Sequence, residues 1–185
     1  MVVDTLNKRI AGAEAHRAGQ SFEDLFAYAC RRLGIVATRV PDGCRQLRGQ
    51  KLIRVKSPFD WIVSCSPDIP PGWAQPPPPK VLLCDTKSTI APTFPYSKID
   101  QHQLEQLRGH ERNGILAGYV VEFRASRDVV FFPALTLASC EGRRGSLSPA
   151  EGIHLGSSEA FNVGKLLKPQ HRPADSHLPG RTPPT

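Results

Sequence analysis

The sequence lacks long apolar runs and paired cysteine motifs. Nowhere do about twenty apolar residues follow one another, as a membrane-spanning helix requires. Its five cysteines are scattered without a C-x-x-C pair, which favours reduced structural thiols over a disulfide framework or a zinc ribbon. The first residues lack the charged start and apolar stretch of a signal peptide. These absences predict an intracellular, cytoplasmic protein without a membrane partner, and they leave a cellular or viral origin open.

Positive charge, by contrast, is abundant. Lys and Arg number 24 against 17 Asp and Glu, which gives a formal net charge of +7 and a pI near 9.4. Such a surplus favours an anionic partner, and nucleic acid is the first candidate. A length of 185 residues with 39% hydrophobic residues suits one compact domain with a hydrophobic core and excludes a wholly disordered chain.

Hydrophobic periodicity predicts helices and strands in alternation. The first helix is expected over residues 10–33, with a break near Gly19, a cap at Ser21 and an end at Gly34. This order predicts an α/β or α+β domain with a mixed central sheet. The further elements that we expect are strands at 35–40, 52–55, 59–63, 80–87, 114–123 and 129–132, an amphipathic helix at 99–111 and a short helix at 157–167.

Two proline-rich segments interrupt this pattern. Residues 67–79 contain seven prolines, which neither a helix nor a strand can accommodate, so we expect an extended surface loop between two hairpin strands. Residues 168–185 contain five prolines and no apolar periodicity, which predicts a disordered tail. Residues 1–167 are then expected to form a single domain.

Two residues of opposite charge, Asp85 and Lys87, stand at the end of a predicted strand. Because side chains alternate along a strand, both point to the same face, with their Cα atoms roughly 6.5 Å apart. A carboxylate and an ammonium so placed can act on one reacting centre, the first holding a metal ion and the second stabilising charge. Taken alone, the pair is better explained as a strand-end ion pair, because an acid two residues before a lysine is common by chance.

Further polar residues strengthen the catalytic interpretation. Asp60 begins an otherwise apolar strand, where a carboxylate is costly unless it is paired or bound to a cation. If this strand neighbours that of Asp85, the two acids form an oxygen-rich site suited to Mg²⁺. Gln103 lies on the inward stripe of a helix, where its amide needs a partner. Glu23 lies among apolar residues of the first helix, although a solvated acid is an equally good interpretation there.

In this order, Glu23, Asp60, Asp85-Thr86-Lys87 and Gln103 resemble the PD-(D/E)xK nuclease superfamily. The resemblance implies an α/β, restriction-endonuclease-like fold with a mixed central β-sheet flanked by helices. It also implies that the single domain is a nuclease domain.

A narrower resemblance is carried by residues 94–104, where Phe94-Pro95 precedes a helix bearing His102-Gln103. This segment is similar to the one that follows the catalytic strand in RecU-type Holliday junction resolvases. The apolar strand at 114–123 is similar to the next strand of that family. The whole similarity extends over about residues 19–132.

The resemblance implies a role for each matching residue. Asp60 and Asp85 would be metal ligands, and Gln103 a further ligand. Lys87 would orient the attacking water and stabilise the pentacovalent phosphate, and Glu23 would be an accessory acid. The implied cofactor is Mg²⁺, for which Mn²⁺ substitutes, and the implied reaction is hydrolysis of a DNA phosphodiester.

The chain departs from the RecU pattern at three places. Asp85 stands where that family more often has Glu, and Pro58 stands where it offers a hydroxyl to the metal. The proline-rich segment 67–79 is much longer than the corresponding family turn. For this reason the family's projecting DNA-contacting element cannot be assigned to that segment from the sequence.

A basic stretch leads into Asp60 and is expected to contact DNA phosphates beside the acids. It carries one acid, Asp42, and a local net charge of +5. Its basic residues are Arg39, Arg45, Arg48, Lys51, Arg54 and Lys56. With no zinc finger or evident helix-turn-helix, we expect recognition of DNA shape rather than base sequence.

The leading hypothesis is a Mg²⁺-dependent, structure-specific endodeoxyribonuclease, in particular a Holliday junction resolvase that makes symmetric nicks in four-way DNA junctions. Two symmetry-related cuts suit a homodimer. Two alternatives stay open: a restriction-like or repair nuclease of the same fold, and a non-catalytic DNA-binding protein.

Overall fold

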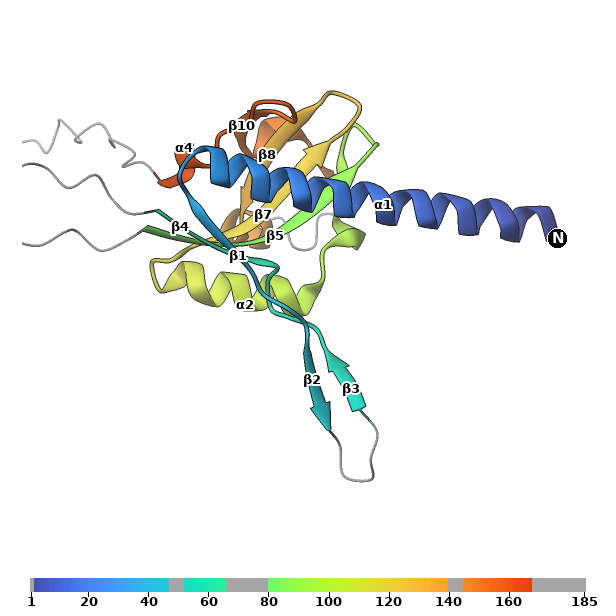
Figure 1. The fold of residues 1–185 in the computed structure, drawn as a ribbon, viewed down its shortest axis with the longest axis horizontal. Helices are drawn as coiled ribbons and strands as arrows, with labels where there is room; N and C mark the ends of the chain where they lie inside the picture. The colour runs from blue at the N-terminus through green and yellow to red at the C-terminus, as the bar shows by residue number, and fades with distance from the viewer. Residues whose placement is uncertain (1, 47–51, 66–79, 140–144, 168–185) are drawn as a thin grey trace, which may run out of the picture.

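A six-stranded mixed sheet forms the centre of the protein in a computed structural model (Figure 1). The structure describes residues 2–46, 52–65, 80–139 and 145–167. The strands of the central sheet, in spatial order, are β1 (Val36–Arg39), β4 (Trp61–Cys65), β5 (Lys80–Thr89), β7 (Leu116–Phe123), β8 (Asp128–Pro133) and β10 (Ile153–Ser157). Only β5 and β7 pair in parallel within this sheet. The predicted α/β fold with a mixed central sheet flanked by helices is confirmed.

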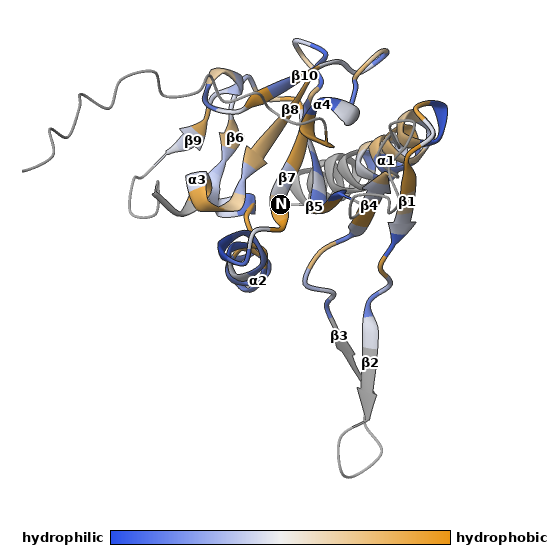
Figure 2. Ribbon diagram, turned by 90° about the vertical axis from the view of Figure 1, so that its left-hand side faces the viewer, coloured by the Kyte–Doolittle hydropathy of each residue, from blue (hydrophilic) through white to orange (hydrophobic). Residues whose placement is uncertain are grey.

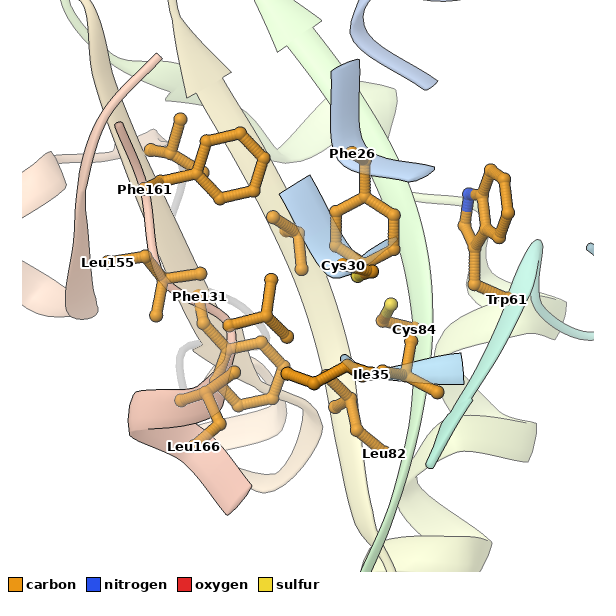
Figure 3. Close-up of a cluster of buried hydrophobic side chains, with 14 of the residues drawn as sticks. Phe26, Cys30, Ile35, Trp61, Leu82, Cys84, Phe131, Leu155, Phe161 and Leu166 are labelled. Carbon is orange, nitrogen blue, oxygen red and sulfur yellow. The ribbon is translucent and has the colours of Figure 1, made fainter. Parts of the chain in front are cut away.

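Helices cover both faces of the sheet. Helix α1 (Val2–Arg32) packs on one face, where Phe22, Phe26 and Trp61 form a core with residues of the short helix α4 (Gly164–Leu167) (Figure 3). Helix α2 (Gln101–Arg112) and the six-residue α3 (Ala134–Ser139) pack on the other face. Figure 2 shows the apolar character of the strands between the helices. The sheet is thus buried on both faces.

A two-stranded hairpin projects away from this body (Figures 1 and 2). It consists of β2 (Gly43–Gln46) and β3 (Leu52–Val55), which pair antiparallel and belong to a separate sheet. The strand expected at 52–55 is confirmed, and it pairs with β2 outside the central sheet. Strand β2 is not predicted from the sequence, because Gly43-Cys44-Arg45-Gln46 shows no apolar alternation.

The first helix differs from its prediction at the amino-terminal end. It begins at Val2 rather than at residue 10, and it continues through Gly19 without a break. One glycine costs a helix only about 1 kcal/mol, and the alanines that precede it favour the helix. Ser21 therefore lies inside the helix and does not cap it. The predicted end at Gly34 is confirmed, with φ of +67° at that glycine.

The region after β8 contains more strand than predicted. Residues 153–157 form β10, which pairs with β8, and the helix expected at 157–167 shrinks to α4. A small second pairing joins β6 (Phe94–Pro95) to β9 (Ser146–Leu147). Two 3₁₀ turns complete the described elements, η1 (Tyr96–Lys98) and η2 (Pro149–Glu151).

The remaining predictions have mixed outcomes. The hairpin of β7 and β8 and the long strand β5 are confirmed. The thiols of Cys30, Cys65 and Cys84 are free, as expected. Residues 67–79 and 168–185 lie outside the described part, so the loop and tail remain predictions. None of the described helices combines the length and apolar character that crossing a membrane requires.

Candidate active site

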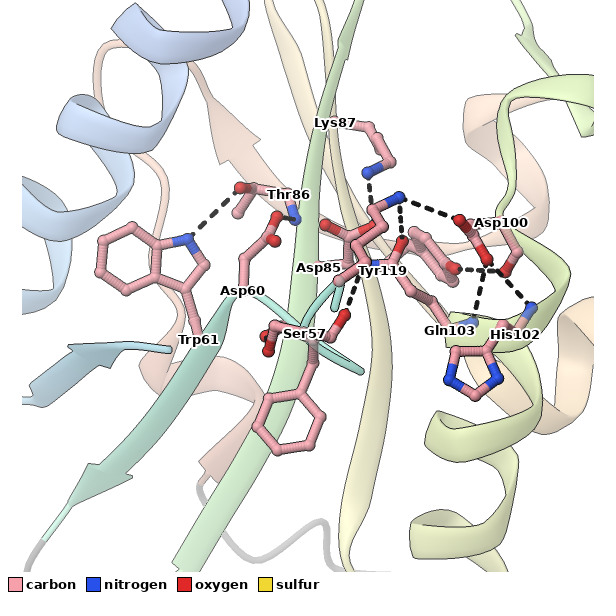
Figure 4. Close-up of polar contacts among 12 residues, drawn as sticks. Ser57, Asp60, Trp61, Asp85, Thr86, Lys87, Asp100, His102, Gln103 and Tyr119 are labelled. Atoms are coloured by element: carbon pink, nitrogen blue, oxygen red, sulfur yellow. Dashed lines mark hydrogen bonds and ion pairs between the residues drawn. The ribbon is translucent and has the colours of Figure 1, made fainter. Parts of the chain in front are cut away.

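The two predicted acids meet where β4 begins beside β5. Asp60 directly precedes β4, and its backbone N–H donates to the carbonyl of Cys84 at 3.1 Å. Since Trp61 pairs with Cys84 in the antiparallel register, Asp60 comes to lie opposite Asp85 (Figure 4). The backbone N–H of Thr86 donates to Oδ2 of Asp60 at 3.3 Å and holds that carboxyl across the strand. Strands β4 and β5 are thus neighbours, as the sequence predicts.

Asp85 is the most buried ionisable group of this cluster. Its side chain has 0% exposure, and its Oδ2 lies 2.5 Å from Nζ of Lys87. Burial raises the pKa of Asp85 well above its usual range, and the neighbouring Asp60 carboxyl adds to the increase, while Lys87 opposes it. Asp85 and Lys87 therefore share one face of β5, as the alternation of side chains predicts.

Lys87 lies between the buried acid and solvent. Its side chain is 25% exposed, and its ammonium lies 6.0 Å from the ring centroid of Tyr119 on β7. Burial also raises the pKa of Tyr119, whose hydroxyl donates to the carbonyl of Asp100 at 3.4 Å. The aromatic ring thus provides a fixed wall beside the ammonium.

The carboxyl oxygens of Asp60 and Asp85 are of a kind that could bind a divalent cation. Oδ1 of Asp85 is buried and receives no hydrogen bond from any residue that the structure describes. Two carboxyls facing each other with an orphaned oxygen are a hard, anionic pair that a cation would stabilise. Within the described residues, no three His, Cys, Asp or Glu side chains gather as a complete cage. The residues therefore fit Mg²⁺, which is commonly bound by one or two carboxylates together with waters and substrate phosphates.

Gln103 lies beside this pair but already has partners at both ends of its carboxamide. Helix α2 presents it from its first turn, where Asp100 caps the helix by accepting from the backbone N–H groups of His102 and Gln103. Its Nε2 donates to the carbonyl of Ser57 at 3.2 Å, and its Oε1 accepts from Nζ of Lys56 at 3.2 Å. The side chain is buried, as predicted, and its contacts reach the base of the projecting hairpin.

Lys56 belongs to this site, although the sequence does not predict its contacts with helix α2. Its ammonium also lies 3.0 Å from Oδ2 of Asp100, and this hydrogen bond lowers the pKa of Asp100. The sequence predicts for Lys56 only a contact with DNA phosphates. No local pattern could reveal the pairing, because 44 residues separate Lys56 from Asp100.

Glu23 on α1 approaches the acids from the other side of the sheet. Its Oε2 lies 2.6 Å from Nη2 of Arg39, the last residue of β1. Burial raises the pKa of Glu23, Arg39 lowers it and Asp60 raises it. Gly19, Gln20, Glu23 and Arg39 line a small hollow there. The direct partner of Glu23 is therefore Arg39, and Asp60 lies near enough to influence the pKa of Glu23.

The basic stretch follows the projecting hairpin. Arg39 and Lys56 lie at its base and pair with acids of the body, while Arg45 belongs to β2 and Arg54 to β3. Arg48 and Lys51 lie outside the described residues. The hairpin strands thus contain Arg45 and Arg54, and the base of the hairpin lies near the acids. The proline-rich segment 67–79 is a different part of the chain.

Comparisons with known proteins give a structural similarity alone. No protein-family model and no curated protein sequence matches the chain. Among solved structures, the chain is similar to Hjc, a Holliday junction resolvase from the archaeal hyperthermophile Archaeoglobus fulgidus. That match has 16% identity and a TM-score of 0.44, and it covers 74% of this chain and 95% of the other. The function proposed below therefore depends on the residues of the site.

Proposed function

We propose that the protein is a metal-dependent, structure-specific endodeoxyribonuclease that resolves four-way DNA junctions. One observation carries the proposal: the carboxyl of Asp60 meets the buried carboxyl of Asp85 beside the ammonium of Lys87. Asp60 and Asp85 would hold Mg²⁺, for which Mn²⁺ substitutes. When bound, the ion would supply Lewis-acid activation of water and neutralise phosphate charge.

The protein's own groups have separate tasks in this proposal. The backbone of Thr86 fixes the carboxyl of Asp60, so its orientation does not have to be found during the reaction. Lys87, held over Tyr119 and still partly open to solvent, would orient the attacking water and stabilise charge that develops on the phosphate. Glu23, which lies near Asp60, would act as an accessory acid.

The projecting hairpin supports the choice of substrate. A basic element that stands out from the body can enter the open centre of a branched molecule, while the acids lie near its base. Phosphates would be bound mainly by charge, so affinity should fall steeply with salt. The RecU-like residues at 94–104 support the same choice. A junction offers two equivalent strands, so we propose that a homodimer acts on it.

The experiment compares substrates of equal length: a four-way junction, a linear duplex and a single strand, each with Mg²⁺ or with EDTA. We expect paired nicks near the branch point with Mg²⁺ and no product with EDTA. Equal cutting of linear duplex would instead indicate a restriction-like or repair nuclease. Junction binding without any metal-dependent product would leave a non-catalytic DNA-binding protein.

A further inference from the structure

Gln103 is the residue of the site whose contacts differ from the role that the family resemblance implies. The orientation of its carboxamide is fixed by chemistry, because an ammonium can only donate and a carbonyl can only accept. Lys56 must therefore face Oε1, and the carbonyl of Ser57 must face Nε2. With 1% exposure, Gln103 has these two contacts in place of water.

Both partners of Gln103 belong to the segment that leads out of the hairpin. Lys56 and Ser57 directly follow β3, and Asp60 comes three residues after Ser57. The backbone N–H of Ser57 donates to Oδ1 of Asp42 at 2.8 Å, which joins the two ends of the hairpin. The hydroxyl of Ser57 donates to the carbonyl of Phe59 at 2.6 Å. A chain of hydrogen bonds thus runs from the base of the hairpin to the residue before Asp60.

Helix α2 provides the fixed end of this chain. Asp100 caps the helix and also pairs with Lys56, so the first turn of α2 contacts the hairpin base through two side chains, Asp100 and Gln103. The helix itself is anchored by Leu104 and Leu107, which are buried against the sheet. Movement of the hairpin relative to α2 would therefore break contacts next to the acids.

We propose that Gln103 and Lys56 form a latch that fixes the hairpin base, and with it Asp60, against α2, and that Gln103 is a positioning residue rather than a metal ligand. The latch links the element that would grip DNA to the acids that would cut it. Its effect on cleavage rests on the proposed nuclease function. Its effect on the hairpin base does not.

The first test follows hydrogen exchange in the free protein. Gln103→Met removes both contacts of the amide, and Lys56→Met removes the ammonium. Gln106→Met is the matched control, since this residue is exposed on the same helix. We expect amide exchange in residues 52–57 to be at least about tenfold faster in both latch variants. The control and strands β7 and β8 should exchange as in the wild type. Unchanged exchange at residues 52–57 in both variants would overturn the latch.

The second test separates a latch from a metal ligand. Mn²⁺ binding is measured by calorimetry on the wild type, Gln103→Met and Lys56→Met. The latch predicts that both variants weaken binding by the same factor within about threefold, because each releases Asp60 by breaking the same contact. A ligand role predicts that Gln103→Met, which alone removes an oxygen ligand, binds Mn²⁺ about tenfold or more weakly than Lys56→Met does. That second pattern would contradict the proposal.

The third test concerns cleavage and keeps the two proposals apart. If the wild type cuts junctions, both latch variants should lose about 10–100-fold in single-turnover rate. Junction affinity should change less than threefold for Gln103→Met, which removes no positive charge. The double variant should be no worse than the worse single variant, because both residues act through one contact. Additive losses would contradict the latch. A wild-type protein without nuclease activity would refute the proposed function. The hydrogen-exchange and Mn²⁺-binding measurements would still test the latch in that case.

Discussion

Asp85 determines much of the chemistry at the scale of single residues. A carboxyl with no exposed surface is costly to ionise, and the nearby Asp60 makes the cost larger. Lys87 compensates only in part, since its ammonium faces the outer side of the acid and one carboxyl oxygen keeps no partner. Such an arrangement lowers stability, as expected of the cation site that we propose.

We expect Asp85→Asn to stabilise the metal-free protein. Because the folded-state pKa of Asp85 is raised, the wild type loses stability as the pH rises from the ordinary range of a carboxyl through that raised pKa. At neutral pH in EDTA the variant should be more stable by roughly 0.5–2 kcal/mol. The gain should disappear near pH 4. Urea unfolding at both pH values measures it, and a variant less stable at neutral pH would contradict this electrostatic account.

Lys87→Ala should nearly abolish cleavage. The variant removes the ammonium beside Asp85, and a single charge-stabilising group in an active site contributes about 10²–10³-fold in rate. Asp85→Asn should be at least as severe, and junction affinity should fall less than tenfold in both, because binding depends mainly on phosphate contacts. Lys80→Ala, at the exposed start of the same strand, is the control. Near-normal turnover by either site variant would show that the assigned roles are wrong.

Secondary-structure elements show which features the sequence could predict. Strands β5 and β7 were predictable because their apolar runs are buried on both faces. The pairing of β4 with β5 was predictable because two consecutive strands joined by a loop commonly form a hairpin. That pairing brings Asp60 beside Asp85. Strands β2 and β10 carry mixed polar sequences, so tertiary pairing rather than local pattern determines them.

The site was predictable only in part for the same reason. Alternation along one strand is a local rule, so it could join Asp85 to Lys87. The contacts of Gln103 with Lys56 and Ser57 depend on a hairpin that folds back onto α2. Sequence periodicity showed that Gln103 needed a partner, but it could not show which one.

Close packing of β7 against β8 gives a prediction at the scale of elements. A Cβ on Gly118 would lie 2.1 Å from the carbonyl oxygen of Phe132, so the two strands would have to separate. We expect Gly118→Ala to lower the free energy of unfolding by roughly 1–3 kcal/mol. Gly109→Ala is the matched control, because a Cβ meets nothing within 4 Å there and alanine favours a helix by roughly 0.5–1 kcal/mol. Equal unfolding midpoints for the two variants would contradict this packing.

At the scale of the whole molecule, the hairpin and the body have different roles. The hairpin projects from the body, and its strands contain Arg45 and Arg54. The sheet holds the acids near the base of the hairpin. In the free protein the two basic residues at that base, Arg39 and Lys56, pair with Glu23 and Asp100. These pairs connect the base of the hairpin to the body of the protein.

The salt dependence of junction binding tests the role of the hairpin. Each phosphate contact adds about 0.9 to the slope of log affinity against log salt concentration. Arg45→Ala and Arg54→Ala should therefore each lower the slope by about 1. Lys165→Ala, in α4 on the body, should leave it unchanged. If the hairpin variants kept the wild-type slope, DNA would have to bind elsewhere.

The most direct measurement of the central claim is the position of Mn²⁺ in crystals soaked with the ion, located by its anomalous scattering. Our account predicts a peak within about 2.0–2.6 Å of carboxylate oxygens from both Asp60 and Asp85, and no such peak in crystals of Asp85→Asn. A wild-type crystal with Mn²⁺ bound only at other residues would contradict it.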